Sequence, residues 1–133
     1  MAKILVADDE ADLEVLIKQK FRQKIREQQY EFVFAVNGND ALEKIQQHPD
    51  IDIVLSDINM PEMDGYSFIE QVRASGFLKK IPMLMLSASE STEVKIRCLQ
   101  SGADDFIAKP FNPRELAARM NGILRRSRKN NFS

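Results

Sequence analysis

Several apolar runs in this chain end in polar residues whose types could do chemistry. These residues are Asp8, Asp9, Asp57, Ser87 and Lys109. Three carboxylates that met at one place would repel one another, so they would need a cation or a raised pKa. Hard oxygen ligands of this kind suit Mg²⁺. A lysine and a hydroxyl beside them could hold phosphate oxygens, and one carboxylate could take up a phosphoryl group as an acyl phosphate.

The order of apolar and amphipathic segments predicts an α/β fold. The predicted strands are Lys3–Ala7, Glu31–Val36, Ile51–Ser56, Ile81–Leu86 and Phe106–Ala108. The predicted helices are Ala11–Gln28, Asn39–Gln47, one from Asp64-Gly65, Ser91–Ser101 and one from Asn112-Pro113. Because strands and helices alternate, we expect a doubly wound parallel sheet of five strands with five helices on its two faces. The carboxyl ends of parallel strands share one edge, so the polar residues named above should meet in one crevice.

Each of these residues also has an ordinary structural explanation. Acids are favoured in the first turn of a helix, so Asp8 and Asp9 could form a solvated helix N-terminus. Asp57 could cap the loop that follows it, Ser87 could be a turn residue, and Lys109 could be a surface lysine. Their joint occurrence at the ends of predicted strands favours the chemical interpretation.

Length and composition indicate a single domain with balanced charge. The 133 residues include 19 Lys and Arg against 20 Asp and Glu, which argues against a domain-wide nucleic-acid or membrane surface. Cys98 is the only cysteine, so an internal disulfide is excluded. The sequence contains no long apolar run and no signal-peptide pattern, so we expect a cytoplasmic location. We expect the domain to cover residues 1–126, and residues 127–133 to be a basic polar tail or the start of a linker.

Five segments of the sequence resemble the receiver domain of two-component response regulators. They are Ile4-Leu-Val-Ala-Asp-Asp-Glu10, Asp57-Ile-Asn-Met-Pro-Glu-Met-Asp-Gly65, Leu84-Met-Leu-Ser-Ala88, Gly102-Ala-Asp-Asp-Phe106 and Ala108-Lys-Pro-Phe111. The resemblance extends from about Lys3 to Arg126, and the order and spacing of the segments make it specific. It implies a flavodoxin-like sheet with strand order 2-1-3-4-5.

The resemblance also implies a role for each site residue. Asp57 would accept a phosphoryl group from a sensor histidine kinase or a phosphotransfer protein. The implied Mg²⁺ ligands are Asp9, Asp57 and the backbone carbonyl of Asn59, with Asp8 acting through water. Ser87 and Lys109 would contact the phosphoryl oxygens, and the bond between Lys109 and Pro110 is expected to be cis.

In this family, a hydroxyl at the end of the fourth strand and an aromatic ring on the fifth strand form a switch. Here they are Ser87 and Phe106, and phosphorylation would move the hydroxyl toward the phosphate and the ring inward. The fourth helix, fifth strand and fifth helix would then control an output domain in a longer parent chain or a separate partner. The charges on that face resemble those that pair two receivers in winged-helix transcription factors: Lys95, Asp104, Asp105, Glu115, Arg119 and Arg126. A solvated surface of mixed charge is the alternative.

Two other functions compete with a phosphorylation switch. An aspartyl phosphatase usually needs a second acid two residues after the nucleophile, and Asn59 cannot serve as a general acid or base. A docking module that works without phosphorylation would tolerate loss of the acids or the lysine, and all of them are present. The sequence therefore favours a regulatory domain that catalyses only its own phosphoryl transfer and dephosphorylation.

Overall fold

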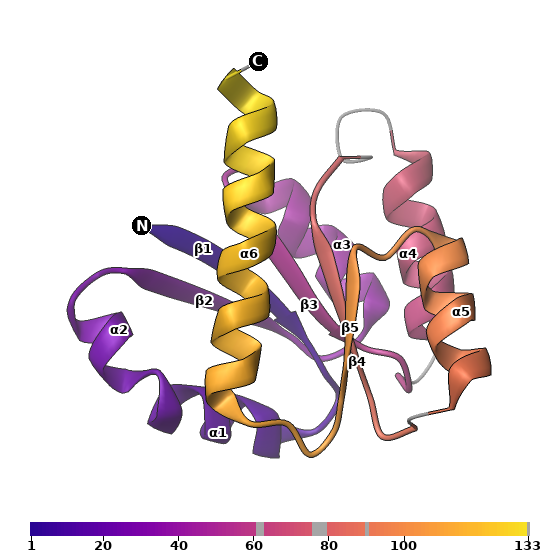
Figure 1. The fold of residues 1–133 in the computed structure, drawn as a ribbon, viewed down its shortest axis with the longest axis horizontal. Coiled ribbons are helices and arrows are strands. Elements are labelled where there is room, and N and C mark those ends of the chain that lie inside the picture. The colour runs from indigo at the N-terminus through magenta and orange to yellow at the C-terminus, as the bar shows by residue number, and fades with distance from the viewer. Residues whose placement is uncertain (61–62, 76–79, 90, 133) are drawn as a thin grey trace.

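The chain folds into a five-stranded parallel sheet with helices on both faces (Figure 1). The computed structural model describes residues 1–60, 63–75, 80–89 and 91–132. The strands are β1 (Ala2–Ala7), β2 (Tyr30–Ala35), β3 (Ile53–Asp57), β4 (Met83–Ser87) and β5 (Asp105–Ala108). The helices are α1 (Ala11–Lys20), α2 (Arg22–Arg26), α3 (Gly38–Gln47), α4 (Gly65–Ala74), α5 (Thr92–Ser101) and α6 (Pro113–Phe132). The strand order β2-β1-β3-β4-β5 confirms the predicted topology.

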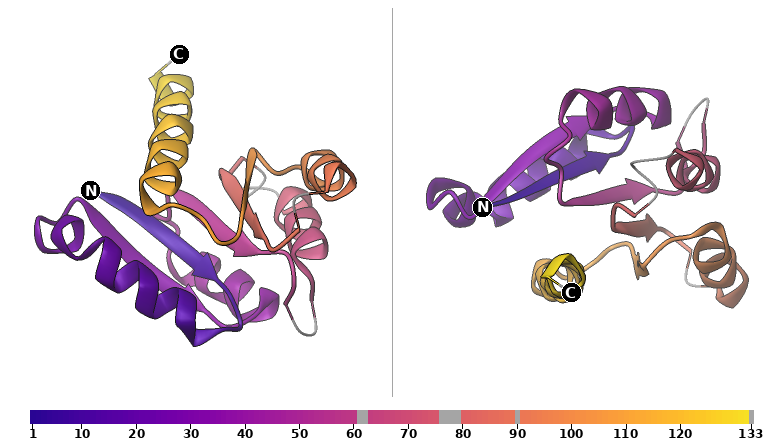
Figure 2. Two further views of the ribbon diagram at one scale, coloured as in Figure 1. Left: turned by 60° about the horizontal axis from the view of Figure 1, so that its bottom comes forward. Right: turned by 90° about the horizontal axis from the view of Figure 1, so that it is seen from above.

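The central strands are apolar because helices cover the sheet on both sides (Figure 2). Every residue of β3 and of β4 is buried. Val54 and Met85 point to one face, where they share a core with Phe68 of α4. Ile53 and Leu84 point to the other face and pack with the apolar sides of α1 and α6. Alternation along each strand thus places successive side chains in different cores.

Most helix ends lie where the sequence predicts them. The side chains of Asn37, Asp64 and Ser91 each accept a hydrogen bond from the backbone N–H three residues later, which caps α3, α4 and α5. Gly102 ends α5 with a φ of 114°, a backbone conformation that suits glycine. Pro113 is the first residue of α6, as expected for proline.

The prediction of one continuous helix over residues 11–28 is wrong. Phe21, with φ −109° and ψ 18°, ends α1 and precedes α2, so the described residues form six helices rather than five. The Phe21 ring is buried, with its centroid 5.9 Å from that of Tyr30 and 5.8 Å from that of Phe32. This packing holds the chain at the sheet, and α2 lies beside β2 (Figure 1). The packing of the Phe21 ring on β2 therefore accounts for the break between the two helices.

At the other end of the chain, α6 extends beyond the sheet (Figure 1). Its backbone remains helical through residues 127–132, where the sequence suggested a polar tail or the start of a linker. Among the helices of the described residues, none combines the length and the apolar character needed to cross a membrane.

Candidate functional site

Two neighbouring strands bring three acids together at the carboxyl edge of the sheet. Asp57 is the last residue of β3, and Asp8 and Asp9 follow β1. One carboxylate oxygen from each acid lies within 4.8 Å of the other two. Asp8 and Asp57 are buried, whereas Asp9 is exposed. The structure therefore confirms the predicted convergence of these acids, and their oxygens form a donor set that could hold a metal ion.

Lys109 supplies a positive charge to this cluster. Its Nζ donates to Oδ2 of Asp8 at 2.9 Å and to Oδ2 of Asp57 at 3.0 Å. The Asp8 and Asp57 side chains are only 3% and 8% exposed, so both ion pairs are largely shielded from water. The peptide bond between Lys109 and Pro110 is cis, as expected.

Burial and ion pairing shift the pKa values of both Asp57 and Lys109. Desolvation raises the pKa of Asp57 above its ordinary value, even though the hydrogen bond from Lys109 acts in the opposite direction. Desolvation lowers the pKa of Lys109, but the hydrogen bonds to Asp8 and Asp57 and the charges of these two carboxylates together outweigh it, and the pKa is raised overall. Three acids with one ammonium group carry an excess of negative charge, which an additional cation would relieve.

Ser87 and Asn59 flank the central carboxylate. Leu86 is the register partner of Asp57 in the β3–β4 pair, so Ser87 lies one residue beyond it at the same edge. The buried Ser87 Oγ accepts a hydrogen bond from the N–H of Ser89 at 3.0 Å, and its hydroxyl can still donate. The N–H of the exposed Asn59 donates to Oδ1 of Asp57 at 3.2 Å.

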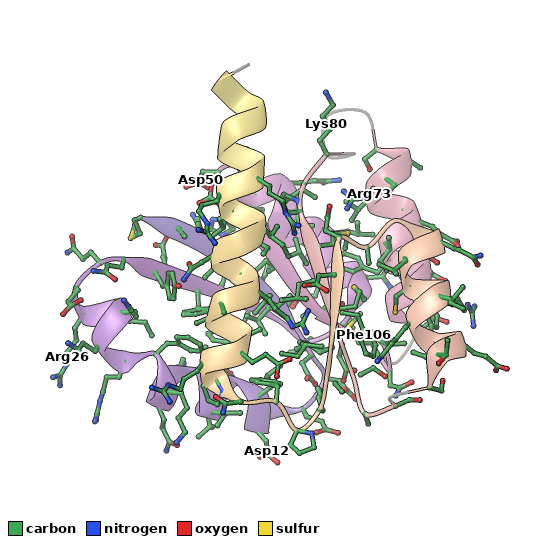
Figure 3. The ribbon with its side chains drawn as sticks, viewed as in Figure 1. Asp12, Arg26, Asp50, Arg73, Lys80 and Phe106 are labelled. Carbon is green, nitrogen blue, oxygen red and sulfur yellow. The ribbon has the colours of Figure 1, made fainter. Side chains whose placement is uncertain are left out.

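The ring of Phe106 lies inside the molecule. Phe106 is 8% exposed and shares a core with Met85 and Cys98. Figure 3 shows it on the side of β5 that faces α5. Lys95 of α5 places its Nζ 5.8 Å from the centroid of this ring. The aromatic residue of the predicted switch therefore occupies the inward position in this structure.

Most of the charges predicted for a dimer face take part in ion pairs within the chain. Arg119 contacts Asp105 at 3.0 Å and Glu115 at 3.2 Å. The hydrogen bond to Asp105 is the main cause of the raised pKa of Arg119. Asp104 instead pairs with Arg73 of α4 at 2.9 Å. The structure thus groups Arg119, Asp105 and Glu115 together, and it separates Asp104 from them.

Two residues with structural roles were not identified from the sequence: Gly65, which lies beside the site, and Arg73, which lies away from it. Arg73 donates to the carbonyl of Gly102 at 2.8 and 2.9 Å, which joins α4 to the loop before β5. Gly65 packs directly against the backbone that follows Asp57. A Cβ at this position would lie 2.7 Å from Cα of Ile58 and 2.8 Å from the carbonyl oxygen of Asp57. Asp64-Gly65 was recognisable as a helix start, but the close approach was not.

Substitution of Gly65 with alanine is expected to destabilise the domain by about 1–3 kcal/mol, because backbone atoms must move to admit the methyl group. The displaced backbone carries Asp57, so the phosphoryl uptake that the sequence leads us to expect at Asp57 should also slow. Urea unfolding and phosphorylation assays would measure the two effects. Gly122→Ala is the matched control, since its Cβ would meet no atom within 4 Å in a helix where alanine is favoured. Equal stability of the Gly65→Ala and native proteins would contradict the close packing.

Comparisons with known sequences identify the family. The response regulator receiver domain family matches residues 4–121. The response regulator GtcR of Aneurinibacillus migulanus is 40% identical over 124 residues, which cover 93% of this chain and 48% of that protein. The transcriptional regulatory protein SpaR of Bacillus subtilis is 39% identical over 133 residues, covering 97% of this chain and 54% of that protein. The chain belongs to the response regulator receiver domain family, and it spans about half the length of these relatives.

Solved structures agree with this assignment. The receiver domain of the Francisella response regulator 1452 superimposes with a TM-score of 0.82 at 35% identity, covering 96% of this chain and 99% of that one. The chemotaxis response regulator CheY4 of Vibrio cholerae gives a TM-score of 0.78 at 35% identity, covering 92% and 98%. The flavodoxin-like fold is thereby confirmed, and the chain is a receiver domain of two-component signalling.

Proposed function

We propose that Asp57 accepts a phosphoryl group from a sensor histidine kinase or a phosphotransfer protein, and that this modification switches an output. The cluster of Asp57, Lys109 and the Asp8-Asp9 pair, in which Asp8 and Asp57 are buried, is the observation that carries the proposal. Relatives such as SpaR are transcriptional regulators of about twice the matched length. Their names support an output domain in a longer parent chain, with a separate partner protein as the other possibility.

The chain's own residues account for the transfer. A carboxylate oxygen of Asp57 attacks the phosphorus of a phosphohistidine and an O–P bond forms. The P–N bond breaks with its electron pair left on the ring nitrogen, and the ring, protonated at its other nitrogen, leaves as neutral imidazole. Lys109, which donates to Asp57 at 3.0 Å, would hold one phosphoryl oxygen. The Ser87 hydroxyl at the same edge would hold another. Asn59 offers no acid for turnover of external esters, which supports a regulatory domain over a phosphatase.

The donor set at this edge fits Mg²⁺. The carboxylates of Asp9 and Asp57 and the backbone carbonyl of Asn59 would hold the ion directly, and Asp8 would act through water. When bound, the ion would neutralise part of the charge on the transferring phosphoryl group. Oxygen donors and the excess of negative charge in the cluster support this choice.

Mg²⁺ is expected to raise the thermal unfolding midpoint of the domain, because it binds the folded cluster and not the unfolded chain. Saturation at 100 times the dissociation constant would add about 2.7 kcal/mol of stability. Beryllofluoride, a phosphoryl mimic, should raise the midpoint further when Mg²⁺ is present. Differential scanning fluorimetry with the two additions, at constant ionic strength, tests the proposed function.

Asp9→Asn should reduce both shifts, since it removes one proposed ligand. Glu70→Gln, which removes an exposed acid from α4, is the matched control and should leave both shifts unchanged. Equal shifts in the Asp9→Asn and native proteins would place the ion elsewhere and contradict the proposal.

We further propose that Ser87 and Phe106 transmit the phosphorylated state. A Ser87 hydroxyl drawn toward the phosphoryl group would stabilise the inward position of the Phe106 ring that this structure shows. Phenylalanine has no hydroxyl, so only packing and the Lys95 contact would report the position of the ring. A coupling free energy of about 1–3 kcal/mol is typical of such switches.

Phosphorylated copies are expected to pair through the face formed by α5, β5 and α6, which correspond to the predicted fourth helix, fifth strand and fifth helix. Arg119, Asp105 and Glu115 could exchange their internal ion pairs for pairs between two copies, together with Lys95, Asp104 and Arg126. Sedimentation velocity with Mg²⁺ and beryllofluoride should show a dimer at low salt that weakens at high salt. Arg119→Ala should weaken the dimer, and the exposed Arg114→Ala should not. A monomer at both salt concentrations would rule out this arrangement.

A further inference from the structure

A second surface lies at the edge strand β2, where α2 packs beside the sheet. We call this surface the α2 groove. Its defining residues are Lys18, Arg22, Ile25, Arg26, Phe32 and Phe34. The groove has a volume of about 700 Å³. Figure 1 shows α2 and β2 on the side of the molecule opposite α5. The groove therefore shares no element with the α5–β5–α6 face.

The floor of the α2 groove is apolar. Ile25, Phe32 and Phe34 line it and are each only partly buried. The ring centroids of Phe32 and Phe34 lie 6.2 Å apart with an interplanar angle of 22°, and Phe32 lies 5.8 Å from the buried Phe21. A row of rings that is anchored in the core and partly open to solvent is a preformed surface for an apolar side chain.

The rim of the α2 groove is positive. Arg22 and Arg26 are exposed, and in the part of the chain that the structure describes neither has a carboxylate oxygen within 4.0 Å of its guanidinium group. Lys18 also lines the rim, but its charge is paired with Glu14 at 3.0 Å, so Arg22 and Arg26 carry the unpaired positive charge of the described rim. Among the described lining residues, Glu31 is the only acid. The whole chain has 19 basic and 20 acidic residues, so its overall charge is nearly balanced. The excess of positive charge at the α2 groove is therefore local and does not reflect the composition of the chain.

The positive surface continues around α2. A neighbouring hollow of about 730 Å³ between α2 and α6 shares Gln28 and Tyr30 with the α2 groove. Lys24 and Arg125 line this hollow, and its described lining includes no acid. Hence positive side chains border both sides of α2, and the partner that complements them is negatively charged.

We propose that the α2 groove binds an acidic protein segment that inserts a leucine or phenylalanine side chain against Phe32 and Phe34. Carboxylates of the segment would pair with Arg22 and Arg26 at the rim. The apolar floor favours a protein over a nucleic-acid duplex, because the phosphate backbone of a duplex would leave that floor uncovered. The groove lies on α2 and β2 and not at Asp57, so binding would not require phosphorylation and would keep a partner attached in both signalling states.

A fluorescein-labelled peptide of alternating glutamate and leucine is the probe. Fluorescence anisotropy should show saturable binding to the full chain, about tenfold weaker for the Arg22→Glu/Arg26→Glu double variant. Lys80→Glu/Arg114→Glu makes the same change in net charge at exposed positions elsewhere and should bind as the native chain does. Figure 3 shows Lys80 far from Arg26.

The apolar floor is tested separately with Phe34→Ser and with a peptide of alternating glutamate and serine. Each change should weaken binding relative to that of the native chain and the glutamate–leucine peptide. Uptake of phosphate from acetyl phosphate should stay unchanged in the arginine double variant, which separates this inference from the proposed function of Asp57. Equal binding of the two peptides, stronger binding of a short DNA duplex at the same arginines, or no saturable binding of the glutamate–leucine peptide would each overturn the proposal.

Discussion

The Asp57→Asn variant is expected to take up no phosphoryl group from acetyl phosphate or from a phosphorylated kinase. An amide oxygen is a poor nucleophile and cannot form the acyl phosphate, whereas the side-chain shape is preserved. Intact-protein mass spectrometry and phosphate-affinity gels would measure the loss. Asp104→Asn is the control, because that acid pairs with Arg73 away from the cluster, and its phosphorylation should be normal. Residual phosphorylation of the Asp57→Asn protein at another acid would contradict the assignment.

The same variant is expected to stabilise the metal-free domain at neutral pH. Burial raises the pKa of Asp57, so its ionised form is disfavoured in the folded state relative to the unfolded chain. The native protein recovers this free energy as pH falls through the folded-state pKa of Asp57 toward the ordinary value of 3.8, and the asparagine variant does not. The difference in the free energy of unfolding should therefore be largest at neutral pH and shrink on acidification. Urea unfolding over this pH range would measure that difference. A difference between the Asp57→Asn and native proteins that grows as pH falls would contradict the assignment.

Replacement of Lys109 with alanine is expected to have the second largest effect. It leaves the buried carboxylates of Asp8 and Asp57 without their ammonium partner, which destabilises a domain by about 3 kcal/mol. It also removes the donor proposed to hold a phosphoryl oxygen, so phosphoryl uptake should slow on the order of 10²-fold. Urea unfolding in metal-free buffer and the rate of phosphorylation by acetyl phosphate would measure these losses.

The dependence on pH and a matched variant make the Lys109 prediction specific. The folded-state pKa of Lys109 is raised by its hydrogen bonds, so its contribution to stability is present at neutral pH and is lost as pH rises through that pKa. Lys18→Ala, which breaks the exposed pair with Glu14, should change stability by less than about 1 kcal/mol. Equal effects of the two alanine variants would mean that the Lys109 pairs behave as surface ion pairs.

The candidate site was predictable because its residues occupy simple positions in the chain. Apolar runs that end in Asp57 and Ser87 identify strands, and parallel strands bring their carboxyl ends to one edge. Asp8, Asp9 and Lys109 follow from the same rule. The observed limits of β3 and β4 differ from the predicted ones by at most two residues, and these shifts do not alter which residues reach the edge.

Features set by distant contacts were not predictable in the same way. No proline or glycine marks the end of α1, and the chain turns at Phe21 because its ring packs on Tyr30 and Phe32 of β2. The role of Arg73 depends on the loop at Gly102, which is far away in sequence. Neither contact leaves a signal in the spacing of apolar residues near it.

The order of the amino acids alone was enough to establish the α/β class, the strand ends and the acids and lysine of the site. These features depend on local periodicity and on the shared direction of parallel strands. Folding in three dimensions was needed to place Lys109 on both Asp8 and Asp57, to bring Gly65 against Asp57, and to form the α2 groove. Such features arise from side chains that meet across the fold, where packing and burial, and not sequence spacing, select the contacts.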